Sequence, residues 1–354
     1  MRATFSSAQI SDVIGVIPSS FSSFDDEIAN YTHDTSSSLK LKEVMGYGIH
    51  HIAPSHVTTA DLAVAGFNEL VARDLIRSSE IDALFFVSQT PDFIIPPTSC
   101  VLHGKFELPA DCYCVDINDG CNGYIKGLFE AFSFMESTSA SCILLIAGDV
   151  LSPIVSRRDR NSFPLVGDAA TLTVLRRSPR LNNDHCVHFE IQTDGSSFDK
   201  LIVPAGGARQ RLSGKVCEEQ DADGNWRSPS QLCMNGRDVF AFTQTRVPDF
   251  LISFCASLGR EPHDYDRIFA HQANSFIIDR LRKKLKVTNY QMPDRVVRQY
   301  GNSSSATIPM LIASEPDSGL MLDCLLCGFG VGLSWGAASL FLAPSSSKGI
   351  IEFS

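Results

Sequence analysis

One of the eleven cysteines, Cys121, stands where a catalytic nucleophile would be expected. It follows the strand-like segment YCVDI and the turn NDG, and the helical segment NGYIKGLFEAFSFME comes after it. The unsatisfied N–H groups and the positive dipole end of a helix start favour a thiolate. We therefore predict that Cys121 has a lowered pKa and acts as a nucleophile, whereas most single cysteines are buried residues with a packing role.

Two polar residues in the second half of the chain are candidates to complete the site. His271 ends the strand-like segment RIFA, and Asn302 lies in the Gly-Asn-Ser turn of YGNSSSATIP, which opens another helical segment. Ligands of α/β proteins bind at the carboxyl ends of strands. Each residue taken alone would be a structural histidine or a turn asparagine, but their matching places favour one shared site.

A weak internal repeat indicates how the chain is organised. IDALFFVSQT from Ile81 resembles YDRIFAHQAN from Tyr265, and the pair SCILLIAG and DAATLTVL resembles DCLLCGFG and WGAASLFL. We therefore predict two similar α/β halves, residues 1–180 and 181–354, with the site between them and a seam at residues 182–185.

The hydrophobic pattern predicts alternating strands and helices, as in α/β proteins. The expected elements are strands at 83–87, 113–117, 142–146 and 171–175, helices at 60–76 and 238–258, and loops at 149–161 and 205–230.

Five segments carry a resemblance to a known family. DINDGCNG, DRNSFPLVGDAATLTVL, FAHQAN, YGNSSSATIP and GFGVGLSWGAA resemble the β-ketoacyl-acyl-carrier-protein synthase III family of the thiolase superfamily, in the family's order and over nearly the whole chain. The resemblance implies a thiolase-like five-layered αβαβα fold and a homodimer. It also implies ping-pong chemistry, in which an acyl group loads onto cysteine and is extended by decarboxylative Claisen condensation with a malonyl thioester. Acyl carrier protein, coenzyme A thioesters or both would be the partners, in fatty acid or lipid biosynthesis, without a metal or another cofactor.

The resemblance also assigns roles at the reacting centre. Cys121 would carry the acyl group, and the backbone N–H groups of Cys121 and Val331 would form the oxyanion hole. His271 and Asn302 would bind the malonyl thioester oxygen and stabilise the enolate that forms as carbon dioxide leaves.

Other matched positions would support the centre or bind partners. Asn274 would orient its neighbours, and Ile95 would reach the acyl pocket of the partner subunit. Arg282, Lys283 and Lys284 would dock the acidic carrier protein.

The chain departs from the family pattern at three places. Val331 replaces a frequent glycine, so its N–H can serve only if the backbone avoids positive φ. The family's N-terminal Trp and Arg, which clamp the adenine of coenzyme A, have no counterpart near Lys42 and Gly46. Phe276 stands where an arginine often helps to hold the carrier. Because the adenine clamp is missing while Arg282, Lys283 and Lys284 remain as a basic patch, we expect both acyl groups to arrive on acyl carrier protein.

Composition limits the other classes of function. The net charge of −10 argues against nucleic-acid binding. We find no apolar run of the roughly 18 residues that span a bilayer, and no secretory signal. Eleven cysteines without such a signal favour a reducing, cytoplasmic location.

Weaker motifs have ordinary structural explanations. Cys324 and Cys327 form a C-x-x-C inside an apolar run, which favours buried strand cysteines over a redox or metal site. His50, His51 and His56 lack nearby acidic or cysteine partners, and a surface loop is expected there.

Two other functions remain open. In one, Cys121 passes its acyl group to an alcohol or amine without decarboxylation; in the other, the chain is a non-catalytic partner subunit. The presence of Asn302 favours condensation over the first, and the presence of Cys121 argues against the second.

Overall fold

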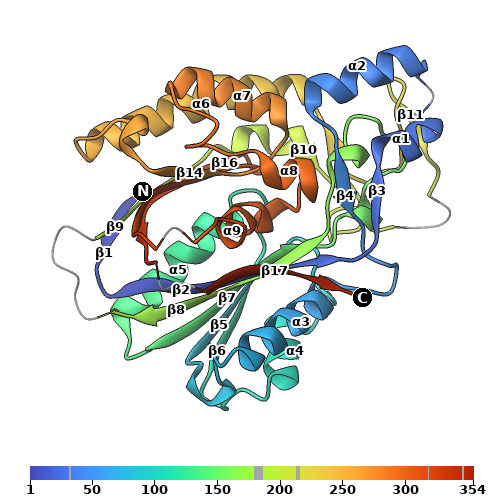
Figure 1. Ribbon diagram of the computed structural model, residues 1–354. Helices are drawn as coiled ribbons and strands as arrows, with labels where there is room; N and C mark the ends of the chain where they lie inside the picture. The colour runs from blue at the N-terminus through green and yellow to red at the C-terminus, as the bar shows by residue number, and fades with distance from the viewer. Residues whose placement is uncertain (32, 179–185, 213–215, 318, 345–346) are drawn as a thin grey trace.

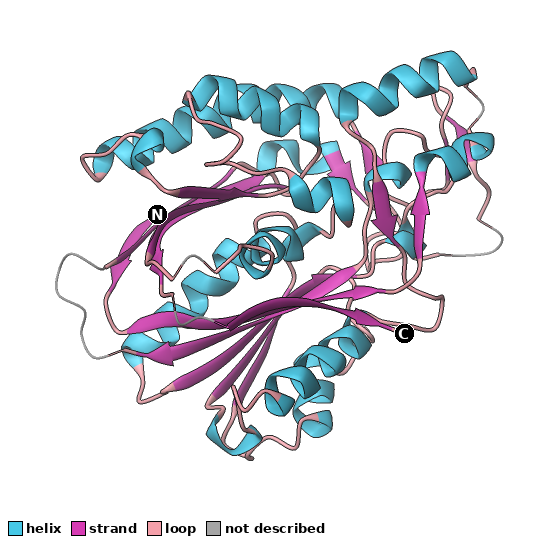
Figure 2. Ribbon diagram, viewed as in Figure 1, coloured by secondary structure: helices cyan, strands magenta, loops and turns pink. Residues whose placement is uncertain are grey.

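Two β-sheets lie face to face, with helices between them and over both outer surfaces (Figures 1 and 2). The computed structural model describes residues 1–354 except 32, 179–185, 213–215, 318 and 345–346. The layers run helix, sheet, helix, sheet, helix, which confirms the five-layered thiolase-like fold. The predicted division at residue 180 remains a prediction, because the expected seam at 182–185 lies outside the described residues.

The first sheet contains six strands. Their order is β17 (Ser347–Phe353), β2 (Ala8–Pro18), β8 (Ala169–Arg177), β7 (Cys142–Asp149), β5 (Ala83–Val87) and β6 (Tyr113–Ile117). The observed β5 and β6 have the predicted bounds, and β7 and β8 extend the predicted strands.

The second sheet contains five strands. Their order is β1 (Arg2–Phe5), β9 (Val187–Thr193), β16 (Ser334–Leu342), β15 (Leu322–Gly330) and β14 (Arg267–Ala270). The N-terminal β1 thus joins the sheet of the second half, and the C-terminal β17 joins the sheet of the first half. This exchange ties the two halves together at both ends of the chain.

The internal repeat corresponds to a repeated strand arrangement. In the first sheet β5 runs parallel to β7, and β7 runs antiparallel to β8. In the second sheet β14 runs parallel to β15, and β15 runs antiparallel to β16. The sequence similarity therefore reflects two sheets built in the same way.

The central layer consists of α5 (Gly123–Ser137) and α9 (Thr307–Ala313). Every residue of α9 is buried. In α5 the helical spacing predicts that Ile125, Leu128, Phe129 and Phe132 are buried; three of them are, whereas Phe129 is only partly buried. A helix that is apolar on nearly every face is stable only between other layers. Both central helices follow a predicted site residue, so their starts bring the two halves of the site together.

Other helices cover the outer faces. These are α3 (Thr59–Ala72) and α4 (Thr98–Lys105) on the first sheet, and α6 (Gly236–Ser257) and α7 (Ser275–Leu285) on the second. The α3 helix begins at its Thr58–Asp61 capping box and ends before Asp74, whose φ of 55° does not continue a helix.

The remaining α-helices and β-strands complete the described fold. They are α1 (Phe24–Glu27), α2 (Thr35–Met45), α8 (Arg295–Gln299), and the strand pairs β3 (Phe21–Ser23) with β4 (Ile49–His51), β10 (Leu201–Ile202) with β13 (Cys233–Met234), and β11 (Glu219–Gln220) with β12 (Trp226–Arg227). The predicted loop at 205–230 therefore contains one small two-stranded sheet.

Candidate active site

Cys121 lies in the turn between β6 and α5, one residue before the N-cap of α5, Asn122. The N–H of Val331 hydrogen-bonds the sulfur from the loop after β15. A Cβ atom added at Gly330 would lie 2.6 Å from Sγ, so only glycine lets the end of β15 approach so closely. Cys121 and the predicted oxyanion-hole loop are therefore in contact.

The loop after β15 meets the condition that valine imposes. Val331 is not among the described residues with positive φ, whereas its neighbour Gly332 has a φ of 127°. Glycine therefore takes the conformation that a β-branched side chain resists. The N–H of Val331 remains available as a donor.

The expected lowering of the Cys121 pKa is wrong. Burial raises the pKa of the thiol to about 11, and the charges of Asp119 and Asp149 add to this effect. The hydrogen bond from the N–H of Val331 lowers the pKa but does not offset the burial. Desolvation of the thiolate outweighs the helix start, so Cys121 is a thiol at neutral pH.

His271 directly follows β14 and is almost fully buried. The backbone N–H of His271 donates to the carbonyl of Cys327 on β15 over 2.8 Å. The imidazole ring packs edge-on against the ring of Phe329. Burial lowers the pKa of the imidazole to about 3, against a hydrogen bond with the Ser304 backbone that raises it. The ring is therefore neutral at physiological pH and can act as an uncharged donor or acceptor.

Sequence reasoning missed the partner of that ring. Nδ1 of His271 lies 2.7 Å from Oγ1 of Thr307, and this hydroxyl donates to the carbonyl of Ser304 over 2.9 Å. Thr307 begins α9, in the run SSSATIP, where nothing in the sequence separates it from its hydroxylated neighbours.

Asn302 is held by segments from both halves. Its N–H donates to the carbonyl of Leu165, and its own carbonyl accepts from the N–H of Gly167 over 3.0 Å. The side-chain oxygen accepts from the N–H of Ser304, and the amide nitrogen lies 3.4 Å from the carbonyl of Ala273. One amide hydrogen can therefore remain for a substrate in the cavity that Asn302 lines.

Asp149 at the end of β7 is a second buried group that sequence reasoning missed. Its Oδ1 accepts from the N–H of Gln89 over 2.7 Å and from the hydroxyl of Ser88 over 3.0 Å, and Oδ2 lies 3.4 Å from the hydroxyl of Ser305. Burial raises the pKa of this carboxyl to about 6. Asp149 thus joins the loop after β5 to the turn that contains Asn302. Asp149 directly follows the apolar run CILLIAG, and a charged residue in that place was the sequence feature that could have revealed it.

One cavity of about 990 Å³ opens onto Cys121 and Asn302. Polar residues form one part of its lining, including Thr58, Thr59, Gln89, Thr90, Asn118 and Ser304. Apolar residues form another, including Leu151, Ile154, Leu165, Val166, Leu201, Ile202, Val203, Leu232 and Met234. Among the described residues that line it there is no lysine or arginine.

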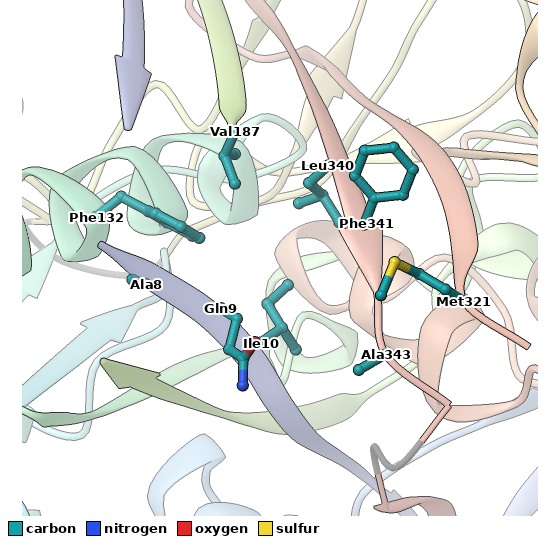
Figure 3. Close-up of a pocket in the computed structure, with 9 residues that line it drawn as sticks. All are labelled: Ala8, Gln9, Ile10, Phe132, Val187, Met321, Leu340, Phe341 and Ala343. Atoms are coloured by element: carbon teal, nitrogen blue, oxygen red, sulfur yellow. The ribbon is translucent and has the colours of Figure 1, made fainter. Parts of the chain in front are cut away.

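A second cavity lies elsewhere, between the start of β2, α5 and the end of β16 (Figure 3). It has a volume of about 220 Å³, and apolar side chains such as Phe132 and Leu340 point toward it. Its described lining contains Gln9 as the one polar residue, so it offers no acid, base or nucleophile.

The predicted docking role of Arg282 is wrong. Arg282 is only 5% exposed, and its guanidinium pairs with Asp279 and Asp294 within the fold. On the same helix, Lys283 and Lys284 are exposed. Of the three predicted docking residues, Lys283 and Lys284 therefore face solvent, whereas Arg282 is a buried structural residue.

Two further predicted residues occupy definite positions. The side chain of Asn274 accepts from the N–H of Ile277 over 2.8 Å, so it caps α7 three residues after His271. Ile95 is 84% exposed, and its neighbours Phe93 and Ile94 are exposed as well. In this chain Ile94, not Ile95, lines the active-site cavity.

The weaker motifs are structural. Cys324 and Cys327 are both buried on β15, as predicted. The expected surface loop at the histidines is wrong for two of them, because His50 and His51 are buried on β4 and bond to carbonyl oxygens of Val166 and Pro18.

The described residues contain no group of three or more His, Cys, Asp or Glu side chains that could hold a metal ion. Within the same part of the chain, we find no helix with the length and apolar character needed to cross a membrane.

Comparison with protein families gives two matches. The model described as 3-oxoacyl-[acyl-carrier-protein (ACP)] synthase III matches residues 115–195, and the model of its C terminal matches residues 255–341. The first segment contains Cys121, and the second contains His271, Asn302 and Val331.

Individual relatives agree with these matches. A β-ketoacyl-[acyl-carrier-protein] synthase III of Clostridium perfringens is 30% identical over 287 residues, which cover 80% of this chain and 85% of the relative. The crystal structure of a 3-oxoacyl-(acyl-carrier protein) synthase from Burkholderia xenovorans LB400 has a TM-score of 0.90 at 32% identity, covering 100% of this chain and 99% of that chain. The priming β-ketosynthase of the R1128 polyketide pathway shares the fold, with a TM-score of 0.78 at 21% identity over 96% of this chain and 97% of that chain. The chain therefore belongs to the 3-oxoacyl-[acyl-carrier-protein] synthase III family of condensing acyltransferases.

Proposed function

We propose that Cys121 carries the acyl group as a thioester. Its sulfur attacks the carbonyl carbon of a donor thioester, the bond to the donor sulfur breaks, and the thiol proton ends on the released donor thiol. The negative oxygen of the tetrahedral intermediate accepts hydrogen bonds from the N–H groups of Cys121 and Val331. The observation that carries this proposal is the N–H of Val331 at the sulfur of a cysteine that lines the cavity.

His271 and Asn302 act in the second half-reaction. They donate to the thioester oxygen of a malonyl group, which stabilises the enolate that forms as carbon dioxide leaves. The carbanion then attacks the acyl carbonyl on Cys121, which releases a β-ketoacyl thioester and restores the cysteine after proton uptake. Neutral donors suit this step because the charge appears only as the reaction proceeds. Burial keeps His271 neutral, as this role requires.

Product analysis tests this function. Wild-type protein supplied with an acyl thioester and a malonyl thioester should give a β-ketoacyl thioester and carbon dioxide, and Cys121→Ala should give no condensation product. Cys142→Ala, at a buried cysteine of β7 outside the cavity lining, serves as the matched control. An ester or amide product without carbon dioxide would replace condensation by acyl transfer to an alcohol or amine. Absence of turnover with intact folding would favour a non-catalytic partner subunit.

The active protein is a homodimer in this proposal. Phe93, Ile94 and Ile95 are adjacent, large, apolar and 55%, 95% and 84% exposed. A contiguous apolar patch of this kind marks an interaction site, and the family implies that Ile95 enters the partner's acyl pocket. Sedimentation of Ile95→Asp should show a monomer, whereas Ile252→Asp, at an exposed site on α6, should remain dimeric.

Acyl carrier protein is the proposed partner, and Lys283 and Lys284 on α7 are its proposed contacts. Both side chains are exposed on an outer helix. Lys283→Glu should slow loading from acyl carrier protein and spare a small thioester donor, because it reverses attraction to an acidic surface. Lys105→Glu, on α4 in the opposite outer layer, is the matched control. Equal slowing by both variants would contradict docking at α7.

We also propose a cytoplasmic location and a role in lipid biosynthesis. All eleven cysteines are free thiols, which suits a reducing compartment.

A further inference from the structure

The active-site cavity has an extended apolar wall. Besides Leu165 and Val166 near Asn302, it includes Ile202 on β10, and Leu232 just before β13. The strand pair β10–β13 lies outside both main sheets. The side chains of Ile202 and Leu232 are only partly buried in the chain as it stands. An apolar occupant would bury them further.

We propose that the acyl group accepted by Cys121 is a hydrocarbon chain much longer than acetyl. This inference rests on the proposed loading of Cys121, and it names the class of substrate that the same site takes. An acetyl group would add only two carbon atoms to the sulfur. The cavity of about 990 Å³ is at the upper end of the range of roughly 300–1,000 Å³ for small-molecule sites.

A short acyl group would leave the apolar wall without contacts. Water beside Ile202, Leu232 and Val166 would find few hydrogen-bond partners, and an empty space would forfeit dispersion contacts. A longer acyl chain would displace the poorly bonded water and restore the dispersion contacts, because each of its methylenes would pack against the apolar wall. Each buried methylene should raise kcat/KM about fourfold, the equivalent of about 0.8 kcal/mol.

The pantetheine arm of a donor does not account for this wall. The arm carries amide groups, and an amide buried without a hydrogen-bond partner is strongly disfavoured. The polar part of the lining, with Gln89, Thr90 and Ser304, offers such partners, whereas the apolar wall offers none from its side chains. The two kinds of lining therefore fit a polar arm and an apolar acyl chain.

A donor series tests the proposal on the wild-type chain. Acetyl, butyryl, octanoyl and dodecanoyl groups are supplied on the same carrier, and the rate of mass increase at Cys121 is measured in a single turnover. Octanoyl or dodecanoyl should load at least tenfold faster than acetyl. Acetyl loading fastest, or equal rates across the series, would overturn the inference and leave the loading of Cys121 intact. If no donor acylates Cys121, the proposed function itself is wrong.

A bulky substitution in the apolar wall of the cavity supplies an independent test. Ile202→Trp should reduce loading of octanoyl by more than tenfold relative to acetyl, because the indole occupies space that the chain needs. Ile252→Trp makes the same change at an exposed position of α6 outside the cavity lining, and should leave the preference unchanged. An unchanged octanoyl-to-acetyl ratio in Ile202→Trp would count against the proposal. Where Ile202→Trp does not fold, Leu232→Trp makes the same test at the facing end of the β10–β13 pair.

Discussion

The Nδ1 atom of His271 lies 2.7 Å from the hydroxyl oxygen of Thr307, which joins the end of β14 to the start of α9. The same hydroxyl lies 2.9 Å from the carbonyl of Ser304. A neutral imidazole carries its proton on one ring nitrogen, and the bond at the other nitrogen decides which. The hydroxyl has one proton, so Nε2 carries the proton that the enolate oxygen requires only when this hydroxyl turns from the Ser304 carbonyl and donates to Nδ1.

Thr307→Val should therefore impair decarboxylation more than loading. Loss of the hydroxyl removes the group that fixes the ring and its tautomer, and such supporting contacts are worth about tenfold to a hundredfold. Thr307→Ser keeps the hydroxyl and should restore carbon dioxide release. Separate rates for Cys121 acylation and malonyl decarboxylation provide the measurement. Equal loss of both rates in the valine variant would indicate a merely structural role.

Stability should depend on pH through His271. Burial lowers the folded-state pKa to about 3, whereas the unfolded value is about 6.5. The unfolded chain then binds a proton that the folded chain does not, so stability falls as pH falls below about 6.5. From pH 7.5 to 5.5 the difference in unfolding free energy between wild type and His271→Asn should decrease by about 1.4 kcal/mol. Urea titrations at both pH values measure this difference, and a constant difference would mean that His271 titrates normally in the fold.

Asn302→Ala should load acyl groups normally but release carbon dioxide about a hundredfold to a thousandfold more slowly. The reason is that enolate charge develops on the malonyl group and not on the acyl cysteine. Asn235→Ala is the matched control, because Asn235 caps α6 outside the cavity lining. That variant should lose stability and keep its decarboxylation rate. A parallel loss of loading in Asn302→Ala would contradict the assignment.

Iodoacetamide should reach Cys121 slowly at neutral pH. Burial raises the pKa of this thiol to about 11, so its alkylation rate should rise about tenfold per pH unit from pH 7 to 10. Cys114 should react earlier, since a hydrogen bond with the Cys112 side chain lowers its pKa. Asp149→Asn should shift the Cys121 profile to lower pH by removing a nearby negative charge. Peptide mapping follows each cysteine, and a profile of Cys121 that levels off near pH 7 would contradict this account.

The sequence predicted features that depend on local pattern. The bounds of β5 and β6 follow from short apolar runs between turn residues. The repeat predicted two similar halves, and its paired segments fall on the equivalent strands of the matching arrangements β5–β7–β8 and β14–β15–β16. The exchange of β1 and β17 could not be predicted this way. Their partners lie more than 180 residues away in one case and more than 330 in the other, and short strands carry no local mark of such pairing.

The residues of the candidate site could be proposed from the sequence, but their surroundings could not. Motifs located Cys121, His271 and Asn302, yet the pKa of Cys121 moved in the opposite direction because burial depends on the whole fold. The predicted docking role of Arg282 was wrong for a related reason. In α7 Arg282 lies four residues after the buried Ile278 and therefore on the same inward face of the helix, where Asp294 pairs with it.

The most direct test of the central claim is a chase of the acyl enzyme followed by mass spectrometry. Wild-type protein is loaded with an acyl thioester, freed of donor, mapped by peptide, and then mixed with a malonyl thioester. We predict one acyl group per chain, on Cys121, which disappears on the chase as an equal amount of carbon dioxide and β-ketoacyl thioester forms. An acyl group on another residue, or one that leaves Cys121 without carbon dioxide release, would contradict the account.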